Sequence, residues 1–131
     1  MKKLILSILM VLPLLMSCAD SVSNILVLDF LDSDNVSIPT EGIYLPIKAE
    51  GQVINVRVTT SHEALLQCLN ADGSKCEYAR FGSKSTEEGN ESLILTVDAN
   101  DTENIRYFRV VATNSGGSTV SIPCKQDKIS K

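Results

Sequence analysis

The sequence predicts an all-β fold, an antiparallel sandwich of the immunoglobulin-like class with about seven to eight strands. Two observations support this prediction. Short runs in which apolar and polar residues alternate recur along the chain, and turn-forming residues separate them at intervals of about 8–12 residues. The chain of 131 residues is long enough for one such domain of about 100 residues with short appendages.

Three strands are predicted in the first half of the chain. Residues 25–30 are rich in strand-favouring side chains, and a polar turn at 32–35 follows them. Residues 43–48 also alternate, but Pro46 lacks an amide donor and therefore indicates a strand at the edge of a sheet. Residues 52–59 alternate most regularly, which is typical of a strand that is buried on one side.

The second half continues the pattern with a hairpin and three further strands. Residues 64–81 are predicted to form the hairpin, because Gly73 ends a three-residue loop as in a type I turn closed by a left-handed glycine. Residues 61–69 have fair helix propensity, but we interpret them as strand. The remaining strands are expected at residues 92–98, 106–113 and 118–125.

The N-terminal segment has the pattern of an export signal. Lys2 and Lys3 precede an almost wholly apolar run, residues 4–16, which is shorter than the ~20 residues that a membrane-spanning helix needs. The run closes on the residues LMSC, which resemble the lipobox of bacterial lipoproteins. The resemblance implies that the chain is cut before Cys18 and that this cysteine is acylated on its thiol and on its new amino group.

This interpretation divides the chain into a signal peptide at 1–17, a lipidated Cys18 with a short tether at 18–24, and the β-sandwich domain at 25–131. Two or three acyl chains anchor a protein lastingly, whereas one chain binds a membrane only weakly. We therefore expect the domain to be held in the cell envelope, at the outer membrane, on a face that the sequence does not define. The alternative is an ordinary signal peptide, with Cys18 incidental or in a disulfide.

Composition and charge exclude one large class of function. The chain is 44% hydrophobic and 21% charged, as in an ordinary globular protein, and its formal net charge is −4. Loss of Lys2 and Lys3 with the signal peptide would make the mature chain more negative. Nucleic-acid binding usually needs a basic patch, so no nucleic-acid partner is expected.

Residues 93–126 resemble the close of BACON-type and related all-β repeats of Bacteroidota surface proteins. Those repeats have a strand with Val and then Asn, a polar turn, an Arg at the opening of the next strand, a hairpin with Gly, and a last strand that finishes in Gln. Residues 49–61 and 36–42 are similar to earlier parts of the repeat. The residues that correspond to the closing motif are Val97, Asn100, Arg106 or Arg109, and Gln126.

The resemblance implies an immunoglobulin-like fold and a carbohydrate- or mucin-associated role, as a binding or spacer module of a glycan-handling lipoprotein. The family commonly carries Trp in its central strands, and this chain has none. The aromatic residues that could stack on a sugar are therefore Tyr44, beside Pro46, and Tyr107, which faces away from the expected core residue Phe108. The alternative is that both tyrosines only cover the outer surface of the sheet.

Three cysteines remain in the domain. Cys68 and Cys76 lie directly opposite each other if the hairpin loop has three residues, and an exported protein meets an oxidising compartment, so a Cys68–Cys76 disulfide is predicted. The alternative is that all three cysteines are small buried hydrophobic residues. Cys124 shares a strand face with Val120 and Ile122 and is expected to be a buried free thiol.

The sequence contains no constellation that predicts catalysis or metal binding. His62 is the single histidine, and no nucleophile and acid are spaced to form a triad with it. A zinc site would lack a close-spaced pair of ligands. The loop at 98–103 lacks the glycine and glutamate of a calcium loop, and the loop at 32–35 is shorter still, so both are interpreted as solvated turns. We therefore expect no enzyme activity, no cofactor and no metal.

Two functions from different classes are consistent with these observations. The first is a non-catalytic, lipid-anchored envelope protein that binds glycans or acts as a spacer. The second is a structural or assembly subunit that pairs an edge strand with a partner in an envelope protein complex. Both hypotheses have the membrane as a partner through the lipid on Cys18.

Overall fold

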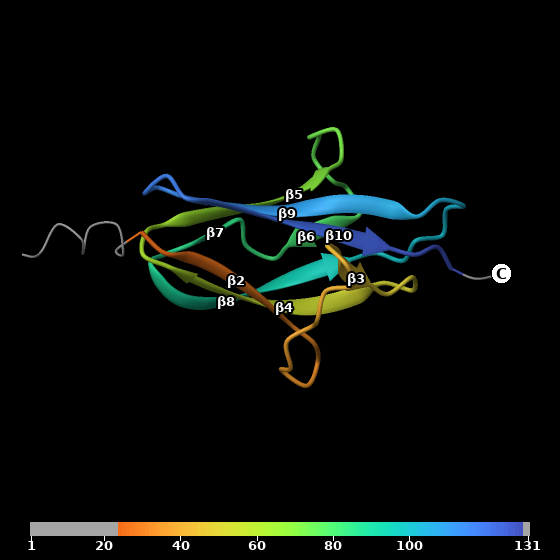
Figure 1. The fold of residues 1–131 in the computed structure, drawn as a ribbon, viewed down its shortest axis with the longest axis horizontal. Coiled ribbons are helices and arrows are strands. Elements are labelled where there is room, and N and C mark those ends of the chain that lie inside the picture. The colour runs from red at the N-terminus through yellow and green to blue at the C-terminus, as the bar shows by residue number, and fades with distance from the viewer. Residues whose placement is uncertain (1–23, 130–131) are drawn as a thin grey trace, which may run out of the picture.

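Two β-sheets packed face to face form the fold (Figure 1). The structure is a computed structural model that describes residues 24–129. The predicted signal peptide at 1–17 and the lipidation site Cys18 lie outside these residues. Within the described range there are nine strands, which confirms the all-β sandwich with slightly more strands than expected. No segment in that range forms a helix long and apolar enough to cross a membrane.

The first sheet has five strands in the order β3-β10-β9-β5-β7. Adjacent strands in this sheet are antiparallel, except that β3 and β10 run parallel. The predicted antiparallel sandwich thus has one parallel pair at the edge of this sheet, because the chain crosses over from the other sheet before it forms β3. The strands are β3 (Leu45–Ile47), β10 (Thr119–Gln126), β9 (Arg106–Asn114), β5 (Ala64–Asn70) and β7 (Ser85–Thr86).

The second sheet has four antiparallel strands in the order β2-β4-β8-β6. Its two central strands pair along their whole length, from Gln52 opposite Val97 to Thr60 opposite Gly89. The strands are β2 (Leu26–Leu31), β4 (Gln52–Thr60), β8 (Gly89–Val97) and β6 (Ala79–Phe81).

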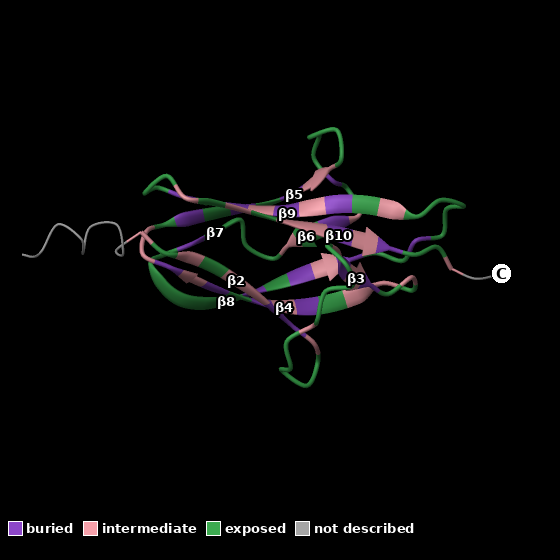
Figure 2. Cartoon of the chain, in the orientation of Figure 1, coloured by how far each residue is buried: buried purple, intermediate pink, exposed green. Residues whose placement is uncertain are grey.

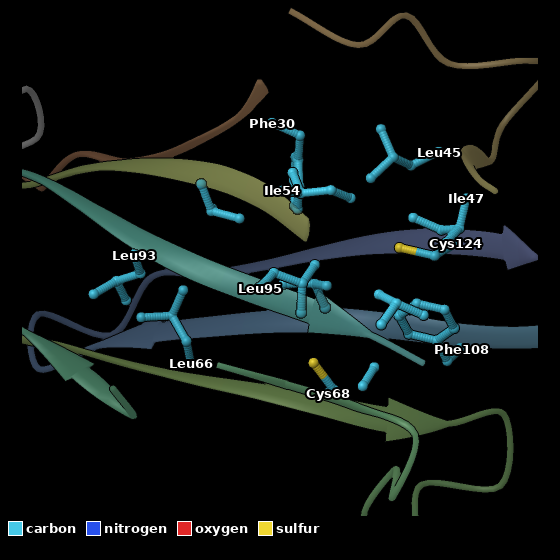
Figure 3. Packing of buried hydrophobic residues seen from close by; sticks show 14 of the residues in the cluster. Phe30, Leu45, Ile47, Ile54, Leu66, Cys68, Leu93, Leu95, Phe108 and Cys124 are labelled. Carbon is cyan, nitrogen blue, oxygen red and sulfur yellow. The ribbon is translucent and has the colours of Figure 1, made fainter. Parts of the chain in front are cut away.

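The alternation in sequence places one side of each long strand between the sheets (Figure 2). Along β4, the side chains of Ile54, Val56 and Val58 are fully buried. Each such side chain contributes about 1.5–3 kcal/mol to the free energy of folding by leaving water. Figure 3 shows Ile54 among the other core side chains, with Leu95 and Phe108. The predicted core position of Phe108 is confirmed.

The strand predicted at 43–48 is shorter in the structure. Only Leu45–Ile47 forms β3, and the Ile43 side chain is 71% exposed, so Ile43 does not join the core as the alternation predicted. Its neighbour Tyr44 closes a tight turn that begins at Glu41, so the strand starts only at the next residue. The edge position of Pro46 is confirmed, because β3 is the terminal strand of its sheet.

The predicted hairpin has the expected loop but a short second arm. Leu69 pairs with Lys75, which is the register expected for a three-residue loop. Gly73 has φ +91°, the left-handed conformation that closes such a loop. Residues 61–69 are confirmed as mostly strand, because β5 covers 64–70. After Cys76 the chain leaves this sheet, and β6 joins the other one. The hairpin predicted at 64–81 is therefore wrong beyond its first few residue pairs.

The start and the end of the domain lie at opposite ends of the sandwich (Figure 1). We call them the tether end, where Asn24 contacts the turn at 114–118, and the far end, where the loop at 98–104 contacts Asp127. The loop at 98–103 was expected to be a solvated turn. That expectation is wrong for Asn100, which is 0% exposed. Its side chain is buried because its amide group donates hydrogen bonds to backbone carbonyls at the far end of the core.

Candidate functional site

Tyr44 and Tyr107, the two tyrosines that the sequence singles out, lie side by side on the surface. Their ring centroids are 5.3 Å apart and the ring planes are tilted by 54°. Tyr107 is 43% exposed and Tyr44 is partly buried. We call this pair the tyrosine platform. The sequence predicted each residue separately, and the structure places them in contact.

Three neighbouring strands position the platform. Phe108 points into the core, so Tyr107 points outward from β9. Lys125 of β10 is the register partner both of Tyr107 and of Pro46 on β3. Tyr44 precedes β3 and is fixed by two backbone hydrogen bonds with Glu41, of 2.8 and 3.2 Å. The parallel pairing of β3 with β10 therefore brings a residue from the first half of the chain to one from the second half.

A small hollow of about 80 Å³ adjoins the platform at the edge of β3. Tyr44, Pro46 and Lys125 line it together with two carboxylates, Glu41 and Asp127. The hollow is too small for a sugar ring alone, because ligand pockets typically enclose about 300–1,000 Å³. The platform is therefore an exposed surface and not a cleft.

The third tyrosine, Tyr78, has a structural role near the far end. The guanidinium of Arg106 lies over its ring, 4.1 Å from the centroid, and Phe108 packs against it edge-on at 5.6 Å. Burial, and next the nearby Cys76, raise the pKa of Tyr78 above its ordinary value, so the phenol stays protonated. An open hollow of about 830 Å³ lies beside Tyr78 and Arg106, with Asp98 and Asp101 on its wall.

Residues of the repeat-like closing motif meet in one buried network. The Gln126 side-chain amide donates to the carbonyls of Asp98 and Lys48, at 2.8 and 3.0 Å. Arg106 donates to the Gln126 side-chain oxygen at 3.4 Å, and Asn100 donates to the Gln126 carbonyl at 3.3 Å. Buried polar groups need such partners, so these motif residues hold the fold together.

The three cysteines of the domain are buried and unpaired in the structure. Figure 3 shows two of them, Cys68 and Cys124, among the core side chains. Cys76 donates its backbone amide to the Cys68 carbonyl at 3.0 Å, so the two residues are opposite each other as predicted. Burial raises the pKa of Cys68 and of Cys124 to about 12, so both remain unreactive thiols near neutral pH. The buried position of Cys124 is confirmed, and the Cys68–Cys76 disulfide stays a prediction.

His62 lies at the tether end, where it lines an open hollow together with Glu63, Glu87 and Glu88. His62 Nδ1 lies 3.0 Å from the Ser61 hydroxyl, at the tether end. No group of three or more His, Cys, Asp or Glu side chains in the described range is placed to hold a metal ion.

Comparison with known proteins supports the fold alone. No family model and no curated protein matches the sequence. A Bacteroides ovatus GH5 xyloglucanase, solved in complex with a XXXG heptasaccharide, matches 79% of this chain with a TM-score of 0.58 and 21% identity. The match covers 19% of the xyloglucanase chain, so this protein corresponds to a small part of it. The periplasmic chaperone SfaE matches 76% of this chain and 56% of its own, with a TM-score of 0.46 and 12% identity.

Proposed function

We propose that this chain is a non-catalytic, lipid-anchored protein of the cell envelope that binds glycans through the tyrosine platform. The observation that carries the proposal is the contact between Tyr44 and Tyr107 on an exposed sheet face. Aromatic rings offer a large apolar surface at low cost in side-chain entropy, and a tyrosine adds a hydroxyl at its rim. Such a pair suits a sugar ring, which has an apolar face and polar edges.

The position of the platform fits an anchored binding module. Asn114, at one end of β9, contacts Asn24 at the tether end, whereas Tyr107 lies near the other end of the same strand. At ~3.4 Å per residue, seven residues of strand separate the two by about 24 Å. A platform at that distance from the tether stays accessible when the chain is fastened to a membrane.

Removal of the outer ring is the direct test of glycan binding. Tyr107→Ala should abolish binding of mature protein to glycans on an array and in isothermal titration, because only one ring of the platform would remain. Val53→Ala is the control, since Val53 is 61% exposed on the outer face of the other sheet. Equal binding by Tyr107→Ala and the unaltered protein, or no binding to any glycan, would contradict the proposal.

The proposed anchor has its own test. Cys18→Ser should abolish incorporation of labelled palmitate and release the protein from the membrane fraction, because the thiol that carries the diacyl group is gone. A variant that still sediments with membranes would contradict lipidation at Cys18. The proposed location is the outer membrane, with the tether at 18–24 holding the domain close to it.

A second proposed function, strand pairing with a protein partner, has one specific observation in its favour. β3 pairs with β10 only at Cys124–Gln126, so the preceding part of this edge is not covered by β3. Asn114 donates its amide to the Ser118 carbonyl, and by alternation the backbone groups of Thr119 and Ser121 point away from β9. Such an edge can accept an added strand.

Proline substitution distinguishes this second function from the first. The Ser121 amide makes no hydrogen bond to β9, so the fold should tolerate Ser121→Pro. The substitution removes the amide that an added partner strand would use, so pairing with a partner should fail. Ser121→Ala keeps the amide and serves as the control. Loss of a co-purifying envelope partner in Ser121→Pro alone would support strand pairing, whereas retention in both variants would exclude it.

A further inference from the structure

We infer that the ligand of the tyrosine platform is an acidic glycan, one that carries carboxylate or sulfate groups. The inference rests on the proposed glycan binding and adds the chemical class of the ligand. Its basis is the charge distribution on the outer face of the five-stranded sheet, which differs from that of the chain as a whole.

The five strands of this sheet contain no Asp or Glu, although the whole chain has 16 acidic and 12 basic residues and a net charge of −4. The same strands contain three cationic residues, Arg106, Arg109 and Lys125. Arg106 is engaged with Tyr78 and with Gln126 at the far end. Arg109 and Lys125 alternate with buried residues and therefore lie on the outer face.

These two cations flank the exposed ring of Tyr107. Lys125 is its direct partner across the β9–β10 pair, and Arg109 follows it by two residues on the same side of β9. Cβ atoms of directly opposed residues are about 4.5–5.5 Å apart. A sugar stacked on Tyr107 would therefore place its substituents within reach of both side chains (the strands are adjacent in Figure 1).

Neither cation is neutralised by an acidic partner within ion-pair distance. The ion pairs within 4.0 Å in the described part of the chain are Arg57–Asp29 and Arg80–Asp98. The Nε atom of Arg109 is buried and has no hydrogen-bond partner, so no protein acceptor engages this nitrogen. Planar guanidinium groups pair well with carboxylate and sulfate-like oxygens, so the Arg109 side chain suits an anionic ligand group.

Two acidic residues beside the platform restrict where the anionic group can lie. Glu41 and Asp127 line the small hollow beside Tyr44 and Lys125, at the edge of β3. A carboxylate or sulfate of the ligand would be repelled there. We therefore place it on the opposite side of Tyr107, towards Arg109. The 54° tilt between the rings further indicates one stacked sugar and not two coplanar ones.

Matched ligand pairs test the charge requirement. The probes are tetragalacturonate and its methyl ester, and a chondroitin 4-sulfate tetrasaccharide and its desulfated form, each titrated into mature wild-type protein. Arg109→Gln should weaken binding of the charged member about tenfold, the expected cost of one charge-assisted hydrogen bond. Lys125→Gln should weaken it less, because Lys125 lies on the side of Glu41 and Asp127. Arg57→Gln, on the outer face of the other sheet, should leave binding unchanged.

The outcomes separate this inference from the proposed function. Binding that requires Tyr107 but is equal for charged and neutral members, or is unchanged in Lys125→Gln and Arg109→Gln, overturns the acidic ligand and leaves glycan binding in place. Binding of charged members that does not require Tyr107 is non-specific ion attraction and overturns both. No binding of either member also overturns both.

Discussion

The two ends of the sandwich are closed by the same device and differ in what they present. Each end has one buried asparagine, Asn114 at the tether end with 3% exposure and Asn100 at the far end with 0%. Each fastens one terminus of the domain through its side-chain amide. The tyrosine platform and the buried Gln126 network, however, belong to the far end.

At the tether end, Asn114 holds the start of the domain. Its amide nitrogen donates to the Asn24 side-chain oxygen at 3.0 Å and to the Ile25 carbonyl and Thr60 hydroxyl at 3.3 Å. Asn24 in turn donates to the Gly116 carbonyl at 2.9 Å. One partner of Asn114 is therefore the side chain of Asn24, which lies near solvent, and water can replace the hydrogen bonds that Asn24 makes.

At the far end, Asn100 holds the last residues of the domain by hydrogen bonds to their backbone carbonyls. Its amide nitrogen donates to the carbonyls of Asn104, Gln126 and Asp127, at 2.8, 3.3 and 3.3 Å. The Ile129 amide donates back to the Asn100 carbonyl at 3.1 Å. Since β10 supports the platform through Lys125, a rigid far end also fixes the platform. The same buried amide therefore fastens a terminus at both ends, but only at the far end does it also support the exposed tyrosines.

The largest expected effect comes from Asn100→Ala. Alanine leaves buried carbonyls without donors and opens a polar cavity, so the free energy of unfolding should fall by about 3–4 kcal/mol. Urea denaturation of the mature domain measures this loss. A loss below that of Asn114→Ala would contradict the difference between the two ends.

Glycine substitutions compare the ends at the level of the backbone. In Gly51→Ala the new Cβ would lie 2.9 Å from the Val97 carbonyl oxygen, and Gly51 has φ +96°. The clash is with backbone that cannot move aside, so about 2–3 kcal/mol of stability should be lost. In Gly116→Ala the nearest atoms to the new Cβ are at the ends of the Asn24 and His62 side chains, at 2.8 Å, which can move aside, so this substitution should cost less. Equal losses in thermal unfolding would show that the tether end is as rigid as the far end.

A smaller loss is expected from Asn114→Ala. Water can reach Asn24 and replace part of the network, so the expected loss in unfolding free energy is about 1–2 kcal/mol. The start of the domain should also become mobile, which amide hydrogen exchange at Ile25 and Leu26 can measure. Unchanged exchange there would show that Asn114 does not hold the tether.

The thiols give a test of the core that lies between the ends. The pKa of Cys124 is raised from 9.0 to about 12 by burial, so its contribution to stability is complete below about pH 9 and is lost as pH rises towards 12. At pH 10 the loss should be about 1–2 kcal/mol for this group under reducing conditions. Cys124→Ala should show a shallower decline in unfolding free energy between pH 8 and 10. An unchanged decline would assign it to other groups, such as Tyr78.

The sequence predicted the exposed tyrosines but not their contact. Alternation along β9 places Tyr107 outside and Phe108 inside, which one strand determines by itself. The contact between Tyr44 and Tyr107 depends on the parallel pairing of β3 with β10, which no local pattern specifies. Asn100 was placed in a solvated turn because a polar residue in a polar loop gives no signal of burial, and its partners are distant in sequence.

Local chemistry, which the sequence alone determines, decided the strand faces, the three-residue loop closed by Gly73, and the apolar run that ends at Cys18. These features depend on side-chain alternation, on backbone freedom at one residue, and on composition. Tertiary structure decided which strands are neighbours, which polar side chains are buried, and where cations gather around Tyr107. Those features depend on contacts between segments far apart in the chain, because a hydrogen bond or a charge acts on whatever the fold brings close to it.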